Sequence, residues 1–284
     1  MINKVFYIPN LKISNYHPLK FQVRNLFGVT CFVASGNDNI VQHSITDDLC
    51  KNIITMVFNI GKRLKEAGRF EEKTLYDMYS LRTIGGKKLL ITDEDYIKWS
   101  GINQDSLHTL IKYVEEFMNN FGMINLWPVI DRIMLVGDKE NIDINMRDEE
   151  GRVLEVNKSN MWWYHDKDGS HEVQPLIFIL EYIARLYLYH TKKDESYFFT
   201  VDLSCQVNYL GEKYDMGFRG HGLDLLIDIA YLHTVADPNM ELSECACGTW
   251  FYKNLLKKQQ YCNRKCTNRF NIRKFRKAKE EKEG

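Results

Sequence analysis

Residues 245–269 read CACGTWFYKNLLKKQQYCNRKCTNR and contain four of the seven cysteines of this 284-residue chain. The cysteines form two close pairs, Cys245 with Cys247 and Cys262 with Cys266, separated by enough chain for a turn and a β-hairpin or loop. Four thiolates at about 2.3 Å complete the tetrahedron that structural zinc prefers. A segment of about 40 residues has too little apolar surface to order itself, and zinc can supply roughly 10–16 kcal/mol toward that ordering. We therefore expect a structural Zn²⁺ ion to determine the fold here.

The first cysteine pair leaves the ligand set open. One residue between Cys245 and Cys247 makes a tighter bite than the two to four residues usual at zinc sites. If one of these thiols does not bind the metal, a water molecule or a histidine from elsewhere, such as His221 or His233, would have to replace it. Lone histidines, however, are more commonly core or surface residues.

The sequence after Cys266, TNRFNIRKFRKAKEEKEG, predicts a helix because it has no proline, and no glycine before its end. Arg269, Arg273 and Arg276 are spaced by four and three, so they share one face of that helix. Three apolar residues are expected to anchor other parts of the helix to the zinc module: Phe270, Ile272 and Phe275. Aromatic residues upstream are expected to form a small apolar core beneath the metal: Trp250, Phe251 and Tyr261.

The formal net charge of zero conceals a division along the chain. Residues 245–279 carry eleven Lys and Arg and no Asp or Glu, whereas the residues before Cys245 carry 26 Lys and Arg against 35 Asp and Glu. A basic appendage on a body nine charges negative indicates a polyanion partner, with a solvated or self-docking tail as the alternative. The residues predicted to contact nucleic acid are Arg264, Lys265, Asn268, Arg269, Arg273, Lys274, Arg276 and Lys277.

The rest of the chain predicts an α+β body of mixed helices and antiparallel strands. Apolar residues recur at helical spacing after Ser44 and Thr46 up to Gly68, and again over 107–121; helices are also expected from about Val173 to His190 and over 222–235. Strands are expected in the first 40 residues, in a meander over 131–158 and within 196–209, with a loop and aromatics over 159–170. Pro238 and the change in charge place a domain boundary at residue 240. Residues 1–240 are expected to form a body with a sensory or dimerising role. Residues 241–284 are expected to form a zinc finger followed by a basic helix.

The segment Tyr261–Arg269, followed by Arg273, Phe275 and Arg276, resembles the CGNR zinc finger, and Cys247–Gly248 with Phe251 is similar to the first half of that finger. Thr267 stands where the name motif of that family has glycine. In this family the module ends bacterial proteins, often with an ABATE-type N-terminal domain, that are regarded as DNA-binding transcription regulators. The resemblance implies four zinc ligands: Cys245, Cys247, Cys262 and Cys266.

Three functions are therefore compared. The first is a cytoplasmic bacterial regulator that binds nucleic acid, with DNA preferred. It is compatible with a small-molecule effector that binds the body, where aromatics gather over 161–164 and 197–199. It is also compatible with a homodimer. The second is an RNA-binding or protein-interaction module with a structural zinc. The third is an enzyme, for which the body offers acid/base or metal groups: His165, Asp166, Asp168, His171, His221, Asp224 and Asp228.

An enzyme is the least favoured of the three, because the sequence has no phosphate loop, dinucleotide glycine pattern, HExxH motif or nucleophile elbow. No catalytic residue is therefore assigned. The N-terminal residues lack a signal peptide pattern and no apolar run has the length of a membrane span, so a cytoplasmic protein with reduced thiols is expected. The remaining cysteines lie singly in apolar surroundings and are expected to be buried: Cys31, Cys50 and Cys205.

Overall fold

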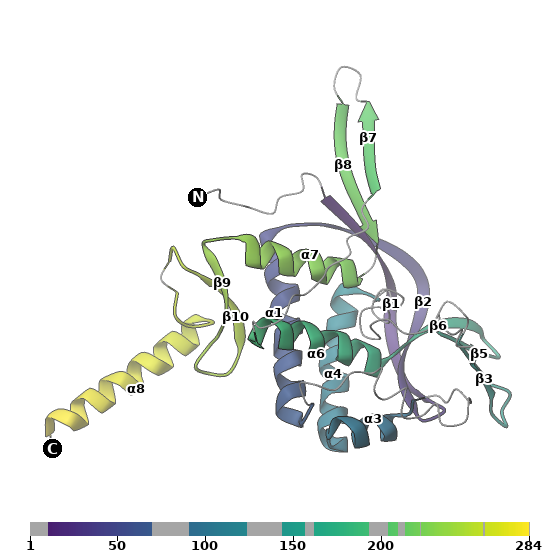
Figure 1. Ribbon diagram of the computed structural model, residues 1–284, viewed down its shortest axis with the longest axis horizontal. Helices are drawn as coiled ribbons and strands as arrows, with labels where there is room; N and C mark the ends of the chain where they lie inside the picture. Colours follow the sequence, from purple (N-terminus) through teal and green to yellow (C-terminus); the bar gives the residue numbers. More distant parts are fainter. Residues whose placement is uncertain are drawn as a thin grey trace.

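The computed structural model describes residues 11–69, 91–123, 144–156, 162–192, 204–209, 214–221, 223–257 and 259–283. The described chain has an α+β fold, as predicted, with a large sheet, a group of packed helices and a projecting C-terminal helix (Figure 1). The strands of the large sheet are β1 (Leu11–Leu26), β2 (Val29–Ser44), β3 (Ile144–Arg147), β4 (Val153–Val156), β5 (Trp162–Asp166), β6 (Gly169–Pro175), β7 (Ser204–Tyr209) and β8 (Tyr214–His221).

These strands lie in the order β3-β4-β5-β6-β2-β1-β8-β7. All neighbours are antiparallel except β1 and β8, which are parallel. The long β1–β2 hairpin therefore joins a meander on one side, β3 to β6, to the β7–β8 hairpin on the other. The predicted strands near the N-terminus, and the part of the predicted meander that is described, are both present; residues 131–143 and 196–203 lie outside the described part.

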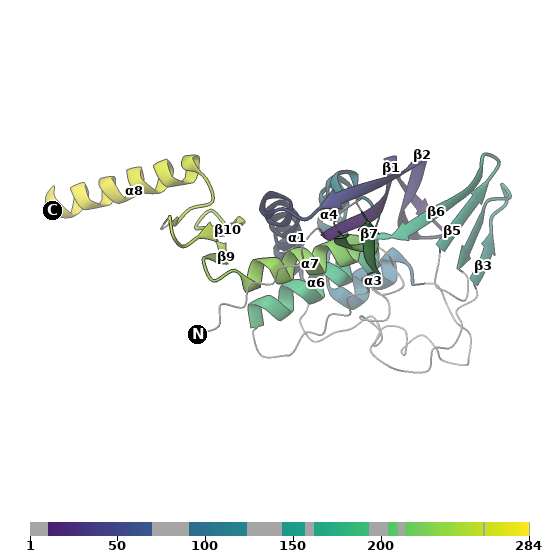
Figure 2. The same cartoon turned by 90° about the horizontal axis from the view of Figure 1, so that it is seen from above.

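The helices of the body are α1 (Asp47–Ala67), α3 (Asp93–Ser100), α4 (Gln104–Phe121), α6 (Leu176–Lys192) and α7 (Leu223–Ala236). Helices α4, α6 and α7 contact β1 or β2, and α1 packs against all three of these helices (Figure 2). One continuous apolar core fills the space between helices and sheet. Among the described residues, no helix combines the length and the apolar composition needed to cross a membrane.

Both ends of helix α1 are specified by residues next to it in the sequence. The hydroxyl of Thr46 accepts a hydrogen bond of 3.2 Å from the Leu49 N–H, which caps the first turn, and Gly68 ends the helix in the left-handed conformation at φ 114°. Within the helix, a Cβ on Gly61 would lie 2.6 Å from the Cβ of Tyr187. The absence of that side chain therefore lets α6 approach α1 closely.

A buried ion pair joins the residue after the C-cap of α1 to α6. The guanidinium of Arg69 donates hydrogen bonds of 2.6 and 2.7 Å to the two carboxylate oxygens of Glu181, and the Tyr96 hydroxyl donates a third of 2.8 Å. The side chains of Arg69 and Glu181 are 1% and 0% exposed. Burial raises the pKa of Tyr96 well above its usual value. Glu181, which interrupts the longest apolar run of the sequence, is therefore satisfied inside the core.

Two local predictions are wrong. Residues 162–175, expected as a loop leading into a helix, form the β5–β6 hairpin, in which Trp163 pairs with Glu172 and Asp166 with Gly169. Helix α6 begins at Leu176, later than Val173. Helix α3 was not predicted. Its capping box, in which Thr92 and Asp95 each accept a hydrogen bond from the backbone N–H of the other, is the sequence signal that identifies it.

Candidate metal centre and basic helix

The four clustered cysteines lie at two neighbouring points of the backbone. A two-stranded hairpin, β9 (Met240–Glu244) and β10 (Trp250–Asn254), carries Cys245 and Cys247 in its connecting turn. Cys262 and Cys266 flank the start of helix α8 (Arg264–Glu283), which begins before Cys266 and not after it. A turn and a helix start thus meet to form one cluster of thiols.

The size of this cluster fits a tetrahedral metal ion. Metal–sulfur distances of about 2.3 Å give a tetrahedron with sulfur–sulfur edges of about 3.8 Å. Cys247 Sγ lies 3.6 Å from Cys262 Sγ, and Cys262 Sγ lies 3.5 Å from Cys266 Sγ. The four sulfur atoms all lie within 4.8 Å of one another. The four cysteines are therefore close enough together to bind a metal ion.

His233, one of the two histidines considered as replacement ligands, is not part of this group. In the part of the chain that the structure describes, the four cysteines are the one set of three or more His, Cys, Asp or Glu side chains with such spacing. His233, on α7, has its Nε2 atom 3.4 Å from a carboxylate oxygen of Asp47 instead. The side chain of His221 lies outside the described part.

Backbone hydrogen bonds shape both halves of the cluster. The Gly248 N–H donates to the Cys245 carbonyl at 2.7 Å, which closes a tight turn in which Gly248 has a φ of 86°. The Cys262 N–H points to Cys245 Sγ at 3.4 Å, which links the two cysteine pairs. Asn263 caps α8, since its side-chain oxygen accepts the Cys266 N–H at 2.9 Å. The sulfur positions are thus fixed by local backbone geometry.

The cysteines differ in how easily they lose a proton. Hydrogen bonding to Thr249, whose hydroxyl lies 3.4 Å from Cys247 Sγ, lowers the pKa of Cys247 to about 6. Burial and the neighbouring thiols raise the pKa of Cys262 above its usual value. The thiolate is the form that binds metal, and the lowered pKa of Cys247 favours that form. A cation at the centre would favour deprotonation of the others.

The cysteine turn is attached directly to the body. The Nζ of Lys62, on α1, donates a 2.7 Å hydrogen bond to the Gly248 carbonyl and also pairs with Glu244. The side-chain amide of Asn59 accepts the Trp250 N–H at 2.9 Å and donates to the Trp250 carbonyl at 3.3 Å. Lys62 and Asn59 were not singled out from the sequence, because nothing local marks contacts that cross more than 180 residues.

Trp250 packs in a different place from the one predicted. Its ring lies 5.3 Å from the ring of Phe58 and 5.8 Å from the rings of Tyr187 and His190, measured between centroids. Trp250 is therefore part of the core of the body and not of a separate core beneath the metal. Phe251 is also buried, whereas Tyr261 stacks on Phe270 at 5.2 Å and lies beside the start of α8.

Helix α8 extends away from the body in both views (Figures 1 and 2). Arg269, Arg273 and Arg276, here called the arginine face, are exposed. The other residues predicted to contact nucleic acid are also exposed, except Lys277, whose side chain lies outside the described part: Arg264, Lys265, Asn268 and Lys274. The guanidinium of Arg273 lies 5.6 Å from the Phe270 ring centroid, so one member of the arginine face contacts the aromatic stack.

The apolar residues of α8 divide into two groups. Phe270 anchors the helix to Tyr261, as predicted. Ile272 and Phe275, predicted to do the same, are 54% and 83% exposed, so that prediction is wrong. Helical spacing places them on the side away from Tyr261, where no part of the described chain covers them.

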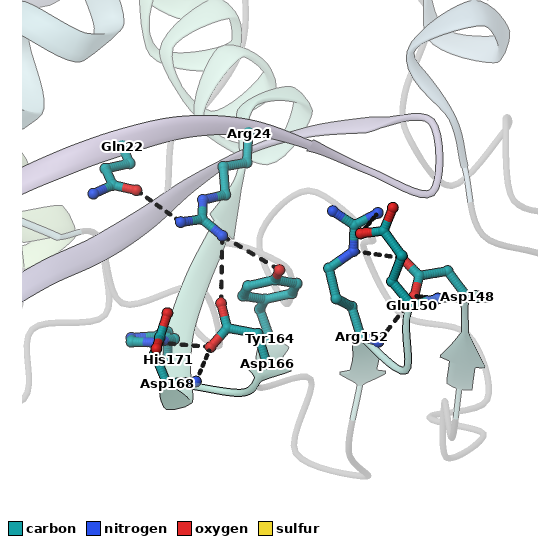
Figure 3. A network of polar contacts seen from close by, with 9 residues as sticks. All are labelled: Gln22, Arg24, Asp148, Glu150, Arg152, Tyr164, Asp166, Asp168 and His171. Atoms are coloured by element: carbon teal, nitrogen blue, oxygen red, sulfur yellow. Dashed lines mark hydrogen bonds and ion pairs between the residues drawn. The ribbon is translucent and has the colours of Figure 1, made fainter.

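Most of the acid/base candidates of the body have structural contacts. Arg24 of β1 donates to the Tyr164 hydroxyl at 3.3 Å and to the Asp166 carboxylate at 3.4 Å, as Figure 3 shows. His171 lies 3.6 Å from the same carboxylate, which also accepts the Asp168 N–H at 2.9 Å. Asp166 thus joins β1 to the β5–β6 hairpin.

The other candidates are dispersed. His165 lies 3.3 Å from a Glu155 carboxylate oxygen and 2.7 Å from the Ser170 hydroxyl. Asp228 is buried in α7 and accepts a 2.8 Å hydrogen bond from the Tyr182 hydroxyl. Asp224 is also buried. The candidates from 165–171 and those from 224–228 therefore lie on different elements, β5–β6 and α7.

The remaining predictions concern single residues of the body. Cys31 and Cys50 are buried as predicted, and burial raises the pKa of Cys50 to about 12. The side chain of Cys205 lies outside the described part. Tyr164 belongs to the core, whereas residues 161 and 197–199, which were considered for an effector pocket, lie outside the described part.

Comparison with known proteins adds no family assignment. No family model matches the sequence, and neither a search of curated proteins nor a search of solved structures finds a match. The four-cysteine cluster is compatible with a zinc finger by its own geometry.

Proposed function

We propose that this chain is a zinc-dependent nucleic-acid-binding protein, and more specifically a bacterial, cytoplasmic, DNA-binding transcription regulator related to the CGNR zinc-finger family. One observation carries the proposal: four cysteines, close enough together to bind a metal ion, adjoin the start of an exposed basic helix. Cys262 and Cys266 flank the first residues of α8, and the arginine face follows within the next turns. A Zn²⁺ ion held by the four thiolates would be structural, since no coordination position would remain open.

The charges support a polyanion as the partner. Residues 245–279 carry eleven basic side chains and no acidic one, so the arginine face lies within a strongly basic segment. The planar guanidinium of arginine can make paired hydrogen bonds to a phosphate or to a guanine edge. Arginines that share one helix face can therefore contact phosphates together once the start of the helix is fixed.

The contacts between the cysteine turn and α1 support a division of roles within the chain. In this proposal, residues 1–240 form a sensory or dimerising body without catalytic function, and residues 241–284 form the nucleic-acid-binding module. Lys62 and Asn59 connect the two, so a ligand that moves α1 would also move the cysteine turn. A small-molecule effector and a homodimer are both consistent with this arrangement.

A salt titration tests the proposal. Binding of a labelled DNA duplex to the zinc-loaded, full-length protein is measured over a range of salt concentrations. About four to six phosphate contacts should give a log–log slope of about −3.6 to −5.4. A flat titration would contradict the proposal. Competition with RNA and heparin separates DNA from other polyanions, because preferential displacement by structured RNA would favour the RNA-binding alternative.

A matched pair of variants locates the binding surface. Replacing Arg269, Arg273 and Arg276 together by alanine should weaken binding by at least tenfold and make the salt slope shallower by about 3. The control replaces three exposed basic residues of the body, and so removes the same charge: Lys98, Arg147 and Lys167. Equal losses in the two triple variants would place the binding site elsewhere.

A further inference from the structure

A second stripe of exposed residues runs along α8 beside the arginine face. At about 100° per residue, Asn268, Ile272 and Phe275 lie within about 60° of one another on the helix surface. The centre of this stripe is about 100° around the helix from the centre of the arginine face. It is here called the apolar stripe. Two chemically different surfaces thus lie side by side on one helix.

The apolar stripe faces away from the metal module. Phe270, which stacks on Tyr261, lies on nearly the opposite side of α8. Ile272 and Phe275 are 54% and 83% exposed, and they are the two most exposed large apolar residues of the helix. The stacking of Phe270 therefore fixes the rotation of α8 so that the apolar stripe points outward.

Charge decides which partner fits this stripe. A second copy of α8 would bring two strongly basic helices together, and the repulsion between their like charges would destabilise the pair. A lipid surface requires a broad apolar face, whereas the described part of α8 offers two exposed apolar side chains between basic residues. Duplex DNA satisfies both surfaces, because its major groove is about 12 Å wide and admits a helix about 10–12 Å in diameter.

We propose that the apolar stripe contacts A·T base pairs in the major groove of DNA. Ile272 and Phe275 contact the C5-methyl groups of thymine, and the side-chain amide of Asn268, one turn earlier, hydrogen-bonds adenine. The arginine face meanwhile holds the phosphates of the groove wall, which set position without reading sequence. The inference rests on the proposed function and adds to it a preference for the thymine methyl group.

Base analogues test this directly, because they change one methyl group and no charge. Full-length, zinc-loaded protein is titrated with four duplexes of equal length: alternating A·T, the same with uracil for thymine, alternating G·C, and the same with 5-methylcytosine. Each methyl contact should be worth about fourfold in affinity. We expect weaker binding to the uracil duplex than to the thymine duplex, and tighter binding to the methylated G·C duplex than to the plain one.

The double variant I272A/F275A should lose both methyl effects and retain the salt slope of the unaltered protein. Alanine favours helix, so α8 should persist in this variant. Circular dichroism measures the helix content, and native mass spectrometry measures the bound metal. V235A, which shortens an exposed apolar side chain of the body, is the control and should keep the methyl effects.

The outcomes separate this inference from the proposed function. If the unaltered protein binds no duplex, both fail. If it binds with a steep salt dependence but equally to thymine and uracil duplexes, the proposed function stands and the reading of methyl groups is overturned. Binding to vesicles of anionic phospholipid, or a concentration-dependent dimer in sedimentation, that disappears in I272A/F275A would likewise overturn it, because the stripe would then have another occupant.

Discussion

The body and the C-terminal module of this protein are ordered by different physical means. In the body, one apolar core extends from β1 to α7 and includes Trp250 of β10. Beyond β10, the described part of α8 is mostly exposed, and its contacts with the preceding segment include the Tyr261–Phe270 stack, the Asn263 cap and the cysteine cluster. The continuous apolar core therefore reaches β10, inside the predicted module of 241–284, and the domain boundary at residue 240 stays a prediction.

The largest expected effect comes from removing the metal ligands. Replacing Cys262 and Cys266 by serine should abolish metal binding, seen by native mass spectrometry, because two thiolates cannot complete the tetrahedron. The start of α8 then loses the roughly 10–16 kcal/mol that a structural zinc supplies, so its amides should exchange hydrogen rapidly. The unfolding of the body in urea should change little.

Treatment of the unaltered protein with a chelator is the matched control and should reproduce both results. If the body lost its cooperative unfolding together with the metal, the conclusion that the two regions are ordered by different means would be wrong. The same conclusion would be wrong if the serine variant kept a full complement of metal.

A second prediction reverses the comparison by weakening the body alone. Glu181→Gln leaves the buried guanidinium of Arg69 without its carboxylate, and breaking a buried ion pair costs about 3–5 kcal/mol. Urea denaturation should show this loss, while metal content at low urea stays unchanged. The double variant R69M/E181L, which removes both charges, should recover much of the stability, since apolar residues often replace such pairs without cost.

The two regions also differ in how far the sequence predicts them. Helices α1 and α4 follow from apolar periodicity bounded by local caps, such as Thr46 and Gly68 for α1, since those signals act within one turn. The grouping of the cysteines follows in the same way from short spacings. The outward direction of Ile272 and Phe275 does not, because it depends on which side of α8 the Phe270 stack occupies.

Contacts between distant segments were also not predictable. Trp250 was assigned to the metal module because it is adjacent in sequence, whereas the edge of β10 meets α1 and buries the ring against Phe58. The β5–β6 hairpin was missed because its aromatic and polar residues are stabilised by partners such as Arg24, more than 130 residues earlier. Sequence patterns report local preferences, and these placements depend on the packing of remote elements.

The smallest expected effect belongs to the junction between the two regions. Lys62→Met keeps the aliphatic stem of the side chain but removes the hydrogen bond to the Gly248 carbonyl and the ion pair with Glu244. A partly exposed pair of this kind contributes up to about 1 kcal/mol, so the urea midpoint of the body should move slightly. The Gly248 turn, however, loses its support from α1, so transfer of the metal to a competing chelator should be several-fold faster.

Lys65→Met, on an exposed position of the same helix, is the control. Equal transfer rates for the two variants would mean that the cysteine turn holds the metal independently of the body.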